Sequence, residues 1–420
     1  MVLKAADELR EHIHYTPCVP SNHQQAFTTY IHYKLDLLQH TGSFKERGIL
    51  NALLTLPEDK KKIGVVTASS GNAAIALCYH AAKLKIPAIV VLTTNVSFAM
   101  VQRCQKLGAK VVIQGYTLWD AMRFARALAR DKGRTYINSL DHPQVLAGYG
   151  TLALEIIYQM PFVDAVLVPV GSGGLAAGVA TVMKRVKPDC LIYGVQPESC
   201  PVFFRTLEQS SDVVNKKNRT MARSVDVPGV GINSFYTVKD LLDKMLLVKD
   251  DWIARAMLHL YEEERYYAEG AAACPLAAII GNLVPELKLK NVVCVITGGN
   301  ENPLIFYRCI EKGMACEGRL LRFKVDIEEG TKPIKRLIQI LAMSGYRVVD
   351  INPDTKWINQ EACGYLTTSV LVETKNLEHA LDLKKIMDKA YPFQNTFETE
   401  PFNDSRTCPC FVHKQTYKAK

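Results

Sequence analysis

The sequence lacks several patterns that would assign it to a specialised class of protein. Its twelve cysteines include no C-x-x-C pair and are scattered over 420 residues, so reduced thiols in a reducing compartment are the simplest account. No basic run is interleaved with aromatic residues, so we expect no nucleic-acid partner despite a net charge of +9. The N-terminus has no apolar segment typical of a secretory signal. Pro169 and several glycines interrupt the uncharged stretch 165–183, so we expect no membrane partner and a cytoplasmic location.

The bulk of the sequence shows the alternation of a parallel α/β protein. Hydrophobic residues make up 48% and charged residues 22%, which is typical of a globular protein, and the length predicts two or three domains. Short apolar runs, each typical of a buried parallel strand, alternate with stretches of helical spacing such as 72–84 and 118–132. This predicts a doubly wound α/β fold. The runs are KIGVVTAS, PAIVVLTT, AKVVIQG, DAVLVPV, CLIYGVQ and NVVCVITGG.

The pattern changes after about residue 318. LLRFKVDI, YRVVDINPD and YLTTSVLVET are typical of strands, and a last strand is expected near Thr396. TKPIKRLIQILAMSG and LEHALDLKKIMDKAY are typical of amphipathic helices. The resulting βαββαβ order predicts a small ferredoxin-like sandwich.

Two segments contain candidate reactive groups. In TGSFKERGIL, Lys45 is either a solvated surface lysine or, if buried beside Phe44, an amine of lowered pKa that serves as a nucleophile. ASSGNAAIAL follows a predicted strand and predicts a helix that begins near Asn72. The backbone N–H groups at that helix start form either a carboxylate site or an ordinary capped N-terminus.

Two further segments lie at predicted strand ends. VPVGSGGLAAG has glycines at 171, 173 and 174, which let backbone N–H groups approach a phosphate closely. A dinucleotide is the alternative, but the next strand ends in Gln196 rather than an acid, so a monophosphate suits the loop better. In VCVITGGNEN, Thr297 would place a hydroxyl at the carboxyl edge of its strand.

Taken in order, these motifs resemble a known family. The series S-F-K-x-R-G, S-S-G-N, G-x-G-G-L, E-G-A and T-G-G-N, together with TPCVPSN and GYGTLALEI, is similar to the fold type II serine/threonine dehydratases and serine racemases. The resemblance covers residues 8–312. It implies a tryptophan-synthase-β-like catalytic domain at 1–318, with a smaller lobe at about 41–145, and pyridoxal 5'-phosphate as the cofactor.

The resemblance also implies residue roles. Lys45 would bind the cofactor covalently and move the Cα proton of an amino-acid substrate, and Phe44 would pack beside the cofactor. Asn72 would bind the phenolic oxygen of the cofactor and Thr297 its ring nitrogen. The phosphate would lie on Gly171, Ser172, Gly173, Gly174 and Leu175, and the substrate carboxylate on Ser69, Ser70, Gly71 and Asn72.

Three functions remain open from the sequence. The first is β-elimination of L-threonine or L-serine to 2-oxobutyrate or pyruvate plus ammonia. The second is serine racemisation, because Ser70 would give a second acid/base group opposite Lys45, although a capping role is equally compatible. The third is an amino-acid sensor that binds the cofactor without turnover, suggested by the departure from the family pattern at 73–75. Gln196 stands where racemases have a cation-binding glutamate, so we expect no metal.

The C-terminal segment 319–400 resembles the ACT-like modules that follow some threonine dehydratases, and 401–420 would be a tail. Such modules imply an allosteric amino-acid or nucleotide effector and a homo-oligomer. A purely structural or oligomerisation domain is the alternative.

Overall fold

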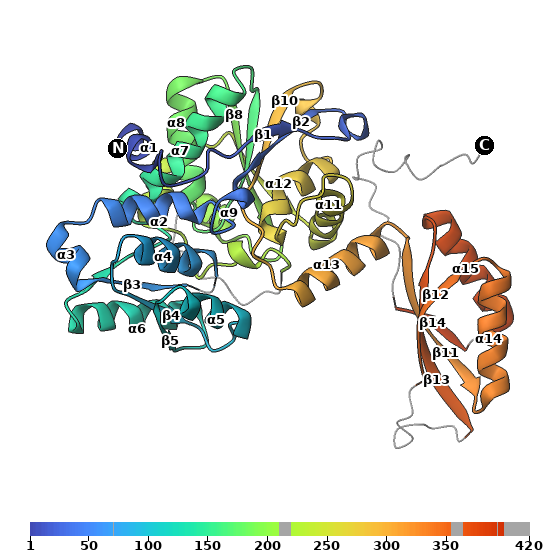
Figure 1. The fold of residues 1–420 in the computed structure, drawn as a ribbon. Helices are drawn as coiled ribbons and strands as arrows, with labels where there is room; N and C mark the ends of the chain where they lie inside the picture. The colour runs from blue at the N-terminus through green and yellow to red at the C-terminus, as the bar shows by residue number, and fades with distance from the viewer. Residues whose placement is uncertain (70, 210–219, 354–363, 393, 399–420) are drawn as a thin grey trace.

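The fold is described from a computed structural model that covers residues 1–69, 71–209, 220–353, 364–392 and 394–398. Its largest sheet has the strand order β1-β2-β10-β7-β8-β9, and every neighbouring pair is parallel except β1 and β2. This arrangement confirms the predicted α/β class (Figure 1). The strands are β1 (Cys18–Pro20), β2 (Tyr30–Leu35), β7 (Ala165–Pro169), β8 (Leu191–Pro197), β9 (Lys244–Val248) and β10 (Asn291–Ile296).

Helices cover both faces of this sheet, which explains why its strands are apolar throughout. Val166 and Val168 of β7 belong to one hydrophobic core, while Ala165 and Leu167 belong to a second core that contains residues of other helices. Alternate side chains of a strand point to opposite faces, so both faces are buried. The first core includes α7 (Pro143–Gln159) and α8 (Gly174–Val186), and the second α11 (Asp250–Glu262), α12 (Gly270–Ile280) and α13 (Pro303–Cys316).

A second, smaller parallel sheet lies within the N-terminal part of the chain, with the order β5-β4-β3-β6. One face packs against α2 and α4, and the other packs against α6. The observed α4 and α6 end one residue before the predicted 72–84 and 118–132. The elements are α2 (Lys45–Leu54), α3 (Glu58–Ile63), β3 (Val65–Ala68), α4 (Asn72–Lys83), β4 (Ala88–Leu92), α5 (Phe98–Lys106), β5 (Lys110–Ile113), α6 (Leu118–Asp131) and β6 (Thr135–Tyr136).

The C-terminal unit is an antiparallel sheet of order β12-β13-β11-β14 with its own hydrophobic core. Figure 1 shows it beyond α13, with α14 and α15 on one face of the sheet. The chain order is βαββαβ, so the predicted ferredoxin-like topology is confirmed. Its elements are β11 (Leu320–Glu328), α14 (Thr331–Met343), β12 (Arg347–Pro353), β13 (Tyr365–Glu373), α15 (Leu377–Ala390) and β14 (Asn395–Phe397).

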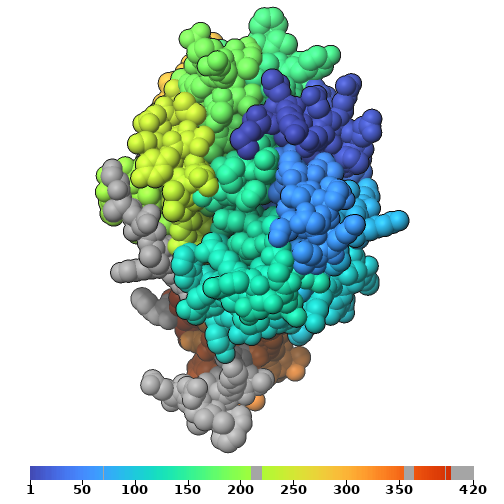
Figure 2. Space-filling model, turned by 90° about the vertical axis from the view of Figure 1, so that its left-hand side faces the viewer, coloured from blue at the N-terminus to red at the C-terminus, as the bar shows by residue number. Residues whose placement is uncertain are grey.

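The helix that begins at Lys45 is held by a close crossing with α7. A Cβ on Gly48 would lie 2.7 Å from the Val145 carbonyl oxygen, and one on Gly148 would lie 2.4 Å from the Arg47 carbonyl oxygen. Glycine on each helix therefore permits backbone contact at the crossing. On the outer side, α1 (Val2–Leu9) packs against α7, and Figure 2 shows this dark blue segment beside the green one.

A buried ion network anchors the same helix. The Arg47 guanidinium donates to Asp36 at 2.7 Å and to Glu155 of α7 at 2.6 Å, and Lys34 of β2 also contacts Glu155. Arg47, Lys34 and Asp36 are fully buried. Charges removed from water are tolerated only when they are paired in this way. The network therefore fixes the position of α2 relative to β2 and α7, and with it the start of α2 at Lys45.

Among the described residues, no helix combines the length and the apolarity needed to cross a lipid bilayer.

Candidate active site

A cavity of about 720 Å³ lies at the carboxyl ends of strands from both parallel sheets. Strands β3, β7 and β10 end at Ala68, Pro169 and Ile296, immediately before the segments that line the cavity. Ligands of open α/β sheets bind at such edges. The lining includes predicted site residues from all four motifs, namely Phe44, Lys45, Ser69, Gly71, Asn72, Gly171, Ser172, Gly173, Gly174, Leu175 and Thr297. Ser70 lies outside the described residues.

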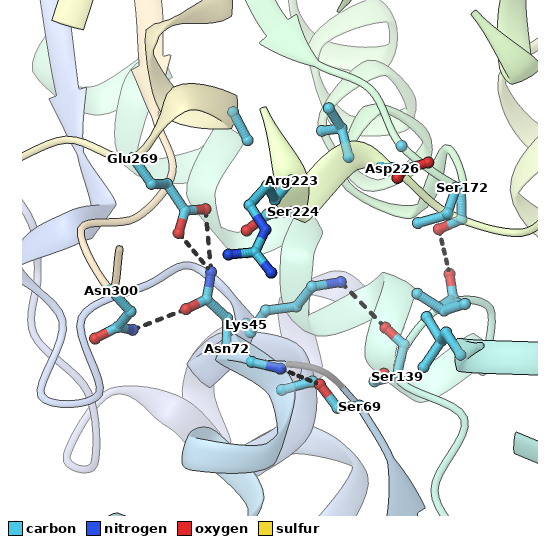
Figure 3. Close-up of a pocket in the computed structure, with 18 of the residues that line it drawn as sticks. Lys45, Ser69, Asn72, Ser139, Ser172, Arg223, Ser224, Asp226, Glu269 and Asn300 are labelled. Carbon is cyan, nitrogen blue, oxygen red and sulfur yellow. Dashed lines mark hydrogen bonds between the residues drawn. The ribbon is translucent and has the colours of Figure 1, made fainter. Parts of the chain in front are cut away.

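Lys45 enters this cavity because its backbone is tied to the end of β10. The Phe44 N–H donates to the Thr297 carbonyl at 2.9 Å, and Ser43 forms a β-bridge with Gly298. The Lys45 Nζ lies 4.9 Å from the centre of the Phe44 ring and 3.3 Å from the Ser139 carbonyl oxygen (Figure 3). Burial lowers the pKa of Lys45 to about 8. A larger share of the amine is therefore neutral and nucleophilic near neutral pH than for an exposed lysine.

Asn72 is held by partners on both sides of its amide. Its Nδ2 donates to both carboxylate oxygens of Glu269 at 3.1 Å, and its Oδ1 accepts from Asn300 Nδ2 at 2.8 Å. The same Asn300 amide donates to the Thr41 carbonyl at 2.8 Å. Figure 3 shows this row of side chains on one side of Lys45. The orientation of the Asn72 amide is therefore determined by the smaller lobe and the large sheet together.

Glu269 is a site residue that the sequence did not single out. It precedes the small-residue run that begins α12, and the motif E-G-A was noted without a role for its acid. Burial raises the pKa of Glu269 to about 7, although hydrogen bonds from Asn72 and Ser224 and the charge of Lys45 oppose the rise. The signal available in the sequence was the position of this acid. Glu269 directly precedes a run that is too apolar to face water, so the acid is expected in the interior together with that run.

The raised pKa of Glu269 predicts a pH-dependent stability. The folded state favours the protonated form of Glu269 more than the unfolded state does. This contribution to the free energy of unfolding is fully present below the ordinary pKa of 4.5 and is lost as the pH rises through about 7. Over that range we expect the cofactor-free wild type to lose up to about 3 kcal/mol of unfolding free energy relative to Glu269→Gln. Urea unfolding at several pH values measures the difference. The exposed Glu58→Gln is the control, and parallel pH curves for wild type and Glu269→Gln would contradict the prediction.

The glycine loop after β7 has the shape of a phosphate cradle. Gly173 has φ +97°, and a Cβ there would lie 2.4 Å from the Phe203 ring. The helix α8 begins at Gly174, where a Cβ would lie 2.9 Å from the Leu140 carbonyl oxygen. Backbone N–H groups at a helix start are unpaired and attract anions. Within the described residues, none of the N–H groups from Gly171 to Leu175 donates to another backbone group.

The remaining predicted residues lie nearby. The Ser172 hydroxyl donates to the Leu140 carbonyl at 3.3 Å, so the backbone N–H is the donor that Ser172 can offer to an anion in the loop. Ser69 Oγ accepts from the Gly71 N–H at 3.1 Å in the turn before α4. Thr297 is 2% exposed at the end of β10, and Leu175 is buried beside the glycines. The structure thus brings together every predicted site residue that it describes.

The cavity thus brings together an amine of lowered pKa, a glycine-lined helix start and a buried hydroxyl, which are the groups that a phosphorylated cofactor bound to a lysine would require. The cradle that a Cβ would fill, together with the amine, fits pyridoxal phosphate. Consistent with this, the chain belongs to the family described as pyridoxal-phosphate dependent enzyme, which matches residues 9–298. The predicted family and cofactor are confirmed.

Particular relatives extend this finding. The chain is 32% identical over 382 residues to the L-threonine ammonia-lyase of Geobacter sulfurreducens, covering 90% of this chain and 94% of the relative. It is similar in structure to the processed form of threonine deaminase isoform 2 from Solanum lycopersicum, with TM-score 0.71, 29% identity and coverage of 74% and 86%. Maize serine racemase is also similar, with TM-score 0.69, 25% identity and coverage of 74% and 96%.

Proposed function

We propose that this protein is a pyridoxal-phosphate-dependent ammonia-lyase that converts L-threonine, L-serine or both to 2-oxobutyrate or pyruvate plus ammonia. The observation that carries the proposal is the desolvated Lys45 amine, which shares one cavity with the glycine cradle and the start of α4. The similarity to an L-threonine ammonia-lyase over nine-tenths of the chain supports the same activity.

Each residue would have a separate task. Residues 69–72 would hold the substrate carboxylate, and the Lys45 amine would take the Cα proton. When bound, the cofactor supplies a ring that accepts the electron pair left on Cα. The β-hydroxyl then departs as water, and hydrolysis of the unsaturated product yields the keto acid and ammonia. The Thr297 hydroxyl, a neutral partner, would suit elimination because it leaves the ring nitrogen unprotonated.

A keto-acid assay tests the proposal. Purified holoenzyme with L-threonine or L-serine should form 2-oxobutyrate or pyruvate at least about a thousandfold faster than Lys45→Ala, because a positioned acid/base group contributes 10²–10⁴-fold and covalent attachment of the cofactor adds to it. A rate no higher than that of Lys45→Ala on both substrates would contradict it. Cofactor absorbance without turnover of any hydroxy amino acid would instead favour the sensor.

A second candidate function is serine racemisation. It is favoured by the similarity to maize serine racemase and by the serine at position 70 of the carboxylate loop. Two acid/base groups on opposite faces of Cα, Lys45 and Ser70, would be needed. Chiral analysis of L-serine incubations distinguishes the two, because pyruvate without D-serine rules out the racemase.

We also propose a division of the chain into a catalytic domain at 1–318, with its smaller lobe at about 41–145, and an ACT-like regulatory domain at 319–400. The separate core of the C-terminal sheet supports this division. The expected tail at 401–420 lies outside the described residues. An amino-acid or nucleotide effector, a homo-oligomer and a cytoplasmic location complete the proposal, and effector-dependent kinetics with sedimentation analysis would test it.

A further inference from the structure

A buried glutamate lies directly after the active-site lysine and does not line the cavity. Glu46 follows Lys45 in the first turn of α2, and its side chain is fully buried. Its Oε2 accepts hydrogen bonds from the Thr41 N–H at 2.7 Å and from the Thr41 hydroxyl at 2.8 Å. A carboxylate removed from water is costly unless such donors surround it. Glu46 therefore fixes both the backbone and the hydroxyl of Thr41, just before the reactive amine.

The second carboxylate oxygen of Glu46 faces the helix that carries Asn72. Glu46 Oε1 lies 3.1 Å from the Nε2 of His80, a buried residue of α4, which begins at Asn72. Neither atom has another hydrogen-bond partner among the described residues. Burial would raise the pKa of Glu46, but the contact with His80 and the two bonds from Thr41 outweigh it and lower that pKa. The ionised carboxylate therefore joins the start of α2 to α4.

Thr41 in turn contacts the side chain that orients Asn72. The Thr41 carbonyl accepts from Asn300 Nδ2 at 2.8 Å, and the same Nδ2 donates to Asn72 Oδ1 at 2.8 Å (Figure 3). Asn300 Oδ1 accepts from Arg103 at 2.8 Å, so both polar atoms of this amide are used and one orientation satisfies them all. A Cβ on Gly42 would lie 2.8 Å from Asn300 Oδ1, so the loop backbone packs directly against the amide. A shift of Thr41 would therefore move Asn300 and Asn72.

The relative position of Lys45 and Asn72 is thus set from behind the cavity. Both residues begin helices of the smaller parallel unit, α2 and α4. The cavity lining includes Asn72 and Asn300 and excludes Glu46 and Thr41, so Glu46 reaches the cofactor site only through other side chains. Displacement of a group at the reacting centre by about 1 Å costs up to about a hundredfold in rate. A residue that fixes Asn72 can therefore affect turnover without touching the cofactor.

We propose that Glu46 is a positioning residue that fixes the orientation of the Asn72 amide through Thr41 and Asn300. This role rests on the proposed function for its effect on turnover, whereas its effect on the bound cofactor does not require turnover. The Asn72 amide would bind the phenolic oxygen of the cofactor, and a hydrogen bond to an ionised oxygen favours the ionised form. Loss of the Glu46 carboxylate should therefore shift the bound cofactor toward the form with a protonated phenolic oxygen.

Absorbance spectra of the holoenzyme measure the two phenolic forms. In Glu46→Leu, which keeps a similar size and removes the acceptor, their ratio should shift about twofold to tenfold, the range for one lost hydrogen bond. Glu46→Gln keeps an acceptor oxygen for Thr41 and should restore most of the wild-type ratio. Glu46→Asp draws the carboxylate back by one methylene and should shift the ratio in the same direction as Glu46→Leu. A wild-type spectrum in Glu46→Asp or in folded Glu46→Leu contradicts the role.

Turnover gives a second readout. The kcat for L-threonine or L-serine should fall about tenfold to a hundredfold in Glu46→Leu and recover most of its value in Glu46→Gln. The predicted spectral shifts in a protein whose wild type forms no keto acid would contradict the proposed function alone. Keto-acid formation by the wild type with unchanged spectra in the Glu46 variants would contradict the positioning role alone.

A double-substitution cycle separates the proposed route from a general loss of structure. If Glu46 acts through Asn300, Glu46→Leu should change the ratio of phenolic forms little further in an Asn300→Ala background, because the route is already interrupted. Shifts that add independently contradict the route, since Glu46 would then act on the cofactor in another way.

Glu264 provides the matched control. It is a buried glutamate outside the cavity lining, it accepts from the Ser21 hydroxyl and the Asn22 N–H, and its Oε1 lies 3.6 Å from His259 Nε2. Glu264→Leu should lower the midpoint of urea unfolding, as Glu46→Leu does, because each leaves buried donors unpaired. It should leave the cofactor spectrum and kcat unchanged. Equal spectral shifts in the two leucine variants would contradict the role of Glu46.

Discussion

Replacing Lys45 by alanine should lower keto-acid formation from L-threonine or L-serine by at least about a thousandfold. The substitution removes both the group that binds the cofactor covalently and the base for the Cα proton. Acid/base catalysis alone contributes 10²–10⁴-fold, and loss of covalent attachment adds to it. Steady-state assays of wild type and Lys45→Ala at saturating cofactor measure the effect.

The protein should remain folded when Lys45 is replaced. Among the described residues, the Lys45 amine makes one hydrogen bond, at 3.3 Å, to a backbone carbonyl. Burial of the amine lowers its pKa, so the charged form is disfavoured there and its removal costs little stability. Lys132→Ala, at the exposed end of α6, is the matched control and should keep full activity. A folded Lys45→Ala protein with activity within tenfold of wild type would contradict the assignment.

Replacing Gly173 by alanine should weaken cofactor binding by about a hundredfold or more. The new Cβ would lie 2.4 Å from the Phe203 ring, and the backbone has φ +97°. A left-handed residue other than glycine costs about 1–2 kcal/mol, and an overpacked site costs about 1–3 kcal/mol. The loop can relieve both by shifting, which moves the N–H groups away from the phosphate. Fluorescence or absorbance titration of cofactor-free protein measures the change.

The control for this substitution separates the effect of backbone strain from the effect of disturbing the phosphate loop. Gly133 also has a positive φ, +62°, but a Cβ there would meet nothing within 4 Å. Gly133→Ala should therefore carry the conformational cost while leaving the cofactor dissociation constant unchanged. If Gly173→Ala and Gly133→Ala bound the cofactor equally well, the loop would not be the phosphate site.

The strands that could be predicted from the sequence are those made mostly of apolar residues. The six apolar runs correspond to β3, β4, β5, β7, β8 and β10. All but β5 are buried along nearly their whole length, because a strand with helices on both faces needs apolar side chains throughout, whereas β5 is a partly exposed edge strand. Strand β2 was missed, since its sequence YIHYKL contains Lys34 and His32. Lys34 is buried there only because Glu155 of α7 lies beside it. That pairing joins residues more than a hundred positions apart, and no local pattern reports it.

The sequence by itself determined the class of chemistry. Glycine-rich and hydroxyl-bearing segments follow predicted parallel strands, and the strands of a parallel sheet direct their carboxyl ends to one edge, where ligands bind. The tertiary structure decided that the edges of the two parallel sheets face one cavity. Only the tertiary structure decided which groups outside the motifs join them. Glu269 reaches Asn72, 197 positions away, and Arg223 borders the same cavity. Both arrive through packing of α12 and η3 (Arg223–Val225), and such long-range packing depends on the shape of the whole core rather than on the residues near them in sequence.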